Sequence, residues 1–97
     1  MMTAEETREI LHKNIQMHTE LGAQKAFHAL DMIEACILNA AKECNTRTEV
    51  HILRLTTFDH EDEKMAYVLT IKEELKKNGY NVTFSPSSEV LHIIWGY

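Results

Sequence analysis

A long apolar seam between residues 23 and 44 is the feature that most restricts how this chain folds. Apolar residues recur there at alternating spacings of four and three over three heptads, which places them on one side of a helix. The seam consists of Ala26, Leu30, Ile33, Ile37, Ala40 and Cys44. A helix with such a face must pack against other elements, so we expect residues 23–44 to form the central helix of the fold.

A second helix is predicted before it, over residues 3–21. Thr3 and Glu6 have the spacing of a capping box at its start. Its apolar stripe is narrower and contains Ile10, Leu11, Ile15, Met17 and Leu21. On one continuous helical wheel the two stripes are centred about 100° apart, and Gly22 lies between them. We therefore expect a break or sharp kink near Gly22, with one long helix as the alternative.

The remainder of the chain alternates between strand and helix patterns. Strands are predicted at residues 49–55, 80–84 and 90–95, and a helix capped by Asp59 runs to about residue 78. The strand–helix–strand unit predicts a parallel pair, and the last two strands predict an antiparallel hairpin. The whole chain, residues 1–97, is thus expected to be one α+β domain of order ααβαββ. We expect a three-stranded mixed sheet of order 1-3-2 with the helices packed on one face.

The amount of apolar surface predicts self-association. The last strand is apolar on both sides, with Val90 and Ile94 on one face and Leu91, Ile93 and Trp95 on the other. A chain of 97 residues that is 44% hydrophobic cannot easily cover this much apolar surface alone. We therefore expect a homo-oligomer, with a twofold dimer preferred, and residues 1–21 as an oligomerisation element. The predicted interface residues are Ile10, Met17, Leu21, Trp95 and Tyr97.

The six histidines are the residues that most invite a chemical role. His51 and His92 lie on two predicted strands and are expected to be cross-strand partners if those strands are neighbours in a suitable register. With Arg54 they form the predicted ligand-binding set. Two imidazoles are too few for a zinc site, which needs three or four ligands. No metal, cofactor or catalytic residue is predicted, and the protein is expected not to be an enzyme.

The net charge and the cysteines of the chain indicate which partners it can bind and in which cellular compartment it is expected. The net charge of −5 argues against a nucleic-acid binder. The chain has no run of eighteen apolar residues and begins with an acidic segment, which argues against a membrane partner and a signal peptide. Cys36 and Cys44, read on one helix, lie about 12 Å apart, too far for a disulfide. Two reduced thiols are typical of a cytoplasmic protein.

The segment 49–95 also has a family-like pattern. A strand is followed by a helix ending Leu-Lys-Lys-Asn-Gly-Tyr, and a hairpin closes on Ile-Ile-Trp. With the apolar helix before it, this pattern resembles the small orphan α+β proteins of phages and prophages of Gram-positive bacteria. The resemblance implies a non-enzymatic accessory factor that binds a host protein or sequesters a small ligand.

Three functions follow from these observations. The first is a small accessory protein that acts by protein–protein interaction as a homo-oligomer, with inhibition of a host protein as one outcome. The alternative is an oligomer that binds an anionic metabolite or nucleotide at a subunit interface through His51, Arg54 and His92. The third is a metal-dependent enzyme that uses the histidines.

Overall fold

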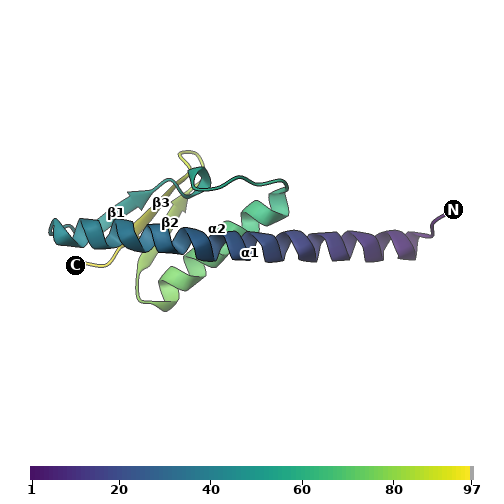
Figure 1. The fold of residues 1–97 in the computed structure, drawn as a ribbon, viewed down its shortest axis with the longest axis horizontal. Coiled ribbons are helices and arrows are strands. Elements are labelled where there is room, and N and C mark those ends of the chain that lie inside the picture. The colour runs from purple at the N-terminus through teal and green to yellow at the C-terminus, as the bar shows by residue number, and fades with distance from the viewer. Residues whose placement is uncertain (97) are drawn as a thin grey trace.

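The structure, a computed structural model, describes residues 1–96 and contains two helices and a three-stranded sheet (Figure 1). The sheet order is β1-β3-β2. Both helices contribute to one core on a single face of the sheet. The predicted α+β class, strand order and one-sided helix layer are therefore confirmed. The elements are α1 (Ala4–Lys42), β1 (Arg47–Val50), the 3₁₀ helix η1 (Ile52–Arg54), α2 (Glu61–Lys77), β2 (Asn81–Ser85) and β3 (Val90–Ile94).

The strand pairing differs from the predicted mixed sheet. β3 pairs antiparallel with β1 on one side and with β2 on the other. The connection through α2 does give β1 and β2 the same direction, as expected. However, β3 lies between them and hydrogen-bonds to both, so the sheet is antiparallel throughout and the prediction of a mixed sheet is wrong.

The predicted break at Gly22 is also wrong, because α1 is one continuous helix of 39 residues. A Cβ atom at Gly22 would overlap the backbone carbonyl of Glu63 and lie 3.0 Å from the Cβ of Ala66. Glycine is therefore needed here for the close approach of α2 and not for a change of direction. The element order is αβαββ in place of ααβαββ.

β1 is shorter than predicted and ends at Val50. The chain then turns into η1, which places Ile52 in the core with no exposed surface. The Tyr67 hydroxyl donates a 2.6 Å hydrogen bond to the Ile52 carbonyl. This buried contact favours the turn over a continued strand. At the start of α2, His60 replaces the predicted cap Asp59, because its Nδ1 accepts from the Asp62 amide at 3.1 Å.

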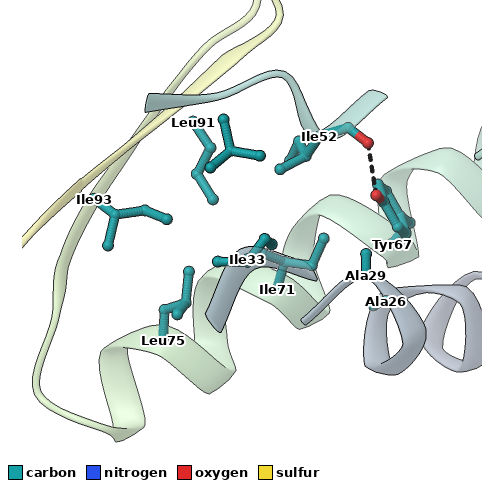
Figure 2. Close-up of a cluster of buried hydrophobic side chains, with 10 residues drawn as sticks. Ala26, Ala29, Ile33, Ile52, Tyr67, Ile71, Leu75, Leu91 and Ile93 are labelled. Carbon is teal, nitrogen blue, oxygen red and sulfur yellow. Dashed lines mark hydrogen bonds between the residues drawn. The ribbon is translucent and has the colours of Figure 1, made fainter. Parts of the chain in front are cut away.

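The core lies where α1, α2 and the inner face of the sheet meet (Figure 2). Two small residues of α1, Ala26 and Ala29, are nearly or fully buried and leave room for α2 to pack closely. The buried cluster consists of Ala26, Ala29, Ile33, Val50, Ile52, Tyr67, Ile71, Leu75, Leu91 and Ile93.

The other face of the sheet carries mainly polar residues. Leu91 and Ile93 point into the core, so Val90, His92 and Ile94 project from the opposite face. Their cross-strand neighbours are Arg47, Glu49, Asn81, Thr83 and Ser85. Val90 is buried and Ile94 is 36% exposed. The apolar surplus that the strand sequences predicted is thus largely absent from the sheet, and most of the exposed apolar surface lies on the helices.

Candidate protein-interaction surface

The N-terminal half of α1 extends away from the rest of the fold (Figure 1). Every residue from Met1 to Met17 is exposed, and His18 is the first to be partly buried. The molecule measures 63 × 23 × 22 Å because of this extension. We call residues 4–21 the N-terminal arm. The segment of the arm that precedes His18 extends about 20 Å away from the core, at 1.5 Å per residue.

One broad side of the N-terminal arm is apolar. Its five large apolar side chains have between 37% and 53% of their surface exposed, and they are Ile10, Leu11, Ile15, Met17 and Leu21. At 100° per residue they lie within about 160° of the helical wheel. An isolated helix of this length is marginally stable in water. Five exposed apolar side chains on one side of such a helix are typical of a surface that packs against another protein.

The base of the arm is fixed to α2 and to the segment just before it by side-chain contacts. The His18 and His60 rings stack with centroids 4.5 Å apart and an interplanar angle of 12°. The Lys25 ammonium forms an ion pair with the buried Glu63 carboxylate and donates to the Thr57 carbonyl at 2.6 Å. These contacts lie on both sides of Gly22 and favour a fixed direction for the arm relative to the core.

Glu63 is the fully buried charged residue at this base. One carboxylate oxygen pairs with Lys25, and the other accepts from the Asp59 amide at 3.2 Å. The hydrogen bond from Lys25 lowers the pKa of the Glu63 carboxyl from its usual value, while burial acts in the opposite direction. The carboxylate is therefore ionised and paired at neutral pH, as a structural contact within the fold.

The predicted interface residues fall into two groups. Ile10, Met17 and Leu21 are exposed on the arm. Trp95 is half-buried, packs against the core and meets the Tyr80 ring edge-on at 6.3 Å between centroids. Trp95 thus belongs to the fold of the single chain, and Tyr97 lies outside the described residues. Leu11 and Ile15, which belong to the predicted apolar stripe but not to the predicted interface, are exposed on the same side of the arm.

Among the predicted ligand-binding residues, His51 and His92 are not directly paired. The strand register places Glu49 opposite His92, and these two side chains interact at 3.2 Å. His51 follows the end of β1 and is exposed, and Arg54 is exposed at the end of η1. The expected cross-strand pair of His51 and His92 is therefore wrong. Glu49 lies beside His92 only because of the strand register, so its role has no signal in the sequence.

A smaller apolar area lies on the outer side of α2. Met65 and Leu69 are more than half exposed and line a shallow groove of about 340 Å³ with Phe84 and Pro86.

Residues 1–96 contain no group of three histidine, cysteine, aspartate or glutamate side chains placed to hold a metal ion. Over the same range, no helix has the length and apolar character required to cross a membrane.

Comparisons with protein-family models, with curated protein sequences and with solved structures find no match to this chain.

Proposed function

We propose that this protein acts as a non-enzymatic accessory factor by protein–protein interaction, and that its N-terminal arm mediates self-association into a homodimer. The observation that carries this proposal is the set of five large apolar side chains on one side of the arm, which the rest of the chain leaves exposed. The arm is held in place at its base by the Lys25–Glu63 pair and the His18–His60 stack. A pre-ordered helix loses less entropy on binding than a disordered segment does.

The size of the apolar face supports a reversible interaction. Burying a half-exposed apolar side chain of this kind contributes roughly 1 kcal/mol, so the ten such side chains of two arms contribute at most about 10 kcal/mol. Association itself costs at least about 4 kcal/mol. The difference is at most about 6 kcal/mol, which corresponds to a dissociation constant of roughly tens of micromolar or weaker.

The ligand-binding alternative has less support. It depended on His51 and His92 facing each other, and the register instead pairs His92 with Glu49. His51 is therefore not the direct cross-strand partner of His92, and the Glu49 carboxylate lies beside His92 instead.

Sedimentation equilibrium with matched arm variants tests the proposal. Ile10→Asp and Leu21→Asp place a charge in the apolar face, and we expect both proteins to sediment at 11.2 kDa with unchanged helix content. Gln16→Asp makes a similar change on the polar side of the same helix and is expected to leave the dimer intact. Ile33→Asp serves as the folding control, because Ile33 is fully buried.

Two results would contradict the proposal. One is a wild-type chain that stays at 11.2 kDa up to near-millimolar concentration. The other is a dimer whose mass is unaffected by both aspartate variants, because such a dimer must use a different surface.

A further inference from the structure

We infer that the two arms pair antiparallel about a twofold axis between Ile15 and Gln16, with Ile10 of one copy facing Leu21 of the other. This inference rests on the proposed self-association and specifies its geometry. It follows from three features of the arm: the spacing of its apolar residues, the charges along one flank, and the residues of α1 that are already paired within the chain.

Three of the apolar residues, together with two polar ones, form a narrow seam along the arm. Positions 7, 10, 14, 17 and 21 follow the three-four spacing of a two-stranded helical interface, and they hold Thr7, Ile10, Asn14, Met17 and Leu21. Glu6, Lys13 and Glu20 recur every seven residues along one flank of this seam. Leu11 and His18 occupy the opposite flank. The seam is thus bordered by alternating charges on one side only.

An antiparallel twofold arrangement makes this pattern self-complementary. When Ile10 faces Leu21 of the second copy, Asn14 faces Met17 of the second copy, and symmetry repeats both contacts. On the charged flank, Lys13 then lies about 3 Å along the axis from Glu20 of the second copy. Each dimer gains two such ion pairs.

The charges also select this register over its neighbours. A shift by one heptad in one direction brings Lys13 beside Lys13 of the second copy. A shift in the other direction brings Glu20 beside Glu20. Both shifted registers therefore place like charges beside each other on this flank, where the proposed register places Lys13 beside Glu20.

A parallel arrangement fits the chain less well. It requires Glu20 to pair with Lys25 of the second copy, but Lys25 already binds Glu63 and the Thr57 carbonyl within its own chain. Parallel helices also align identical residues beyond Leu21, where the same spacing continues with Gln24, His28 and Asp31. Antiparallel pairing instead places the two folded cores at opposite ends, since the core contacts α1 only from His18 onward.

Charge exchange at the flank tests the orientation. Lys13→Glu and Glu20→Lys each convert both ion pairs into repulsive pairs, and we expect each to weaken dimerisation about tenfold. The double variant K13E/E20K exchanges the charges and is expected to restore the wild-type dissociation constant within about threefold. In a parallel dimer positions 13 and 20 do not face each other, so the double variant stays weak.

A distance measurement gives an independent readout. A spin label on the exposed Cys36, in a Cys44→Ser background, reports the separation between the two chains. The antiparallel register places the two labels about 60 Å apart, whereas a parallel pair places them within about 30 Å. A wild-type dimer with a short distance, or one that K13E/E20K fails to restore, overturns the antiparallel inference while the proposed function stands. A wild-type monomer overturns both.

Discussion

Gly22 in the middle of α1 lies directly against the backbone carbonyl of Glu63 in α2. The absence of a side chain at this position lets the two helices approach each other at the base of the N-terminal arm. The same helix segment carries Lys25, whose ammonium pairs with the Glu63 carboxylate. Backbone approach and ion pair together connect the arm to the core.

Gly22→Ala is therefore expected to destabilise the fold, although alanine is the better helix former by about 1 kcal/mol. The added methyl group must displace the α2 backbone, which costs about 2 kcal/mol in the net free energy of unfolding. Urea denaturation followed by circular dichroism measures this difference. Gln24→Ala, at an exposed position of the same helix, is the control and should change stability by less than about 0.5 kcal/mol. Equal or higher stability of Gly22→Ala contradicts the close approach.

Tyr67→Phe tests the buried hydrogen bond that holds η1 in place. Removing the hydroxyl leaves the Ile52 carbonyl without its 2.6 Å donor, which is expected to cost about 1–2 kcal/mol of unfolding free energy. Tyr80→Phe, at a half-buried tyrosine, is the matched control. A loss as small as that of Tyr80→Phe shows that the bond is unimportant.

The same tyrosine predicts that the stability of the fold decreases at alkaline pH. Burial raises the pKa of Tyr67 from 10.0 to about 12, because the charged phenolate is poorly solvated in the core. A raised folded-state pKa means that the stabilisation is complete below pH 10 and is lost as the pH rises toward 12. Unfolding free energies measured over this range should fall more steeply for wild type than for Tyr67→Phe. If the unfolding free energies of the two proteins fall in parallel as the pH rises, Tyr67 does not contribute to the alkaline loss of stability.

The Glu63 carboxylate predicts that the stability of the fold decreases at acid pH, whereas Tyr67 predicts a decrease at alkaline pH. The Lys25 hydrogen bond lowers the folded-state pKa of Glu63 below 4.5, so the stabilisation is present above pH 4.5 and decreases as the pH falls further. Glu63→Gln is expected to lose about 2 kcal/mol at neutral pH, less than for a fully buried pair because Lys25 is partly exposed. Its stability should also vary less below pH 4.5. Thermal unfolding across this range checks both expectations, and they fail together if Glu63→Gln reproduces the wild-type curve.

Trp95 and Ile10 should separate folding from assembly. Trp95 packs against the core, so Trp95→Ala is expected to lower the unfolding free energy by about 2 kcal/mol and leave the dimer dissociation constant unchanged. Ile10→Ala on the exposed arm is expected to leave the unfolding free energy of the core unchanged and to weaken dimerisation about tenfold, because each dimer loses two such side chains. Denaturation and sedimentation on both variants measure the two effects. If Trp95→Ala weakens dimerisation and Ile10→Ala lowers the unfolding free energy, the assignment of Trp95 to the core and Ile10 to the interface is wrong.

The elements with strong local signals were predictable from sequence. The alternating apolar and polar residues of β2 and the apolar run of β3 mark both strands to within one residue. The lysines at the end of α2, followed by Gly79 with a positive φ of 93°, mark where that helix stops. The apolar stripe of the arm was also visible, because helical periodicity is a local property.

The rest depends on contacts between residues far apart in the chain. Gly22 has the same local signal whether it breaks a helix or admits a neighbouring backbone, and only the position of α2 decides between these outcomes. The turn after β1 depends on the bond from Tyr67 to Ile52. The register that brings Glu49 to His92 and the pairing of Lys25 with Glu63 depend in the same way on tertiary packing.

Hydrogen–deuterium exchange at several protein concentrations tests most directly whether the N-terminal arm is an interaction surface. We expect the amides of residues 4–21 to exchange quickly at low micromolar concentration and to become protected toward millimolar concentration, as the helix gains a partner. Amides in the core, such as those of Ile71 and Leu91, should exchange equally slowly throughout. Rapid exchange in the arm at every concentration contradicts the account.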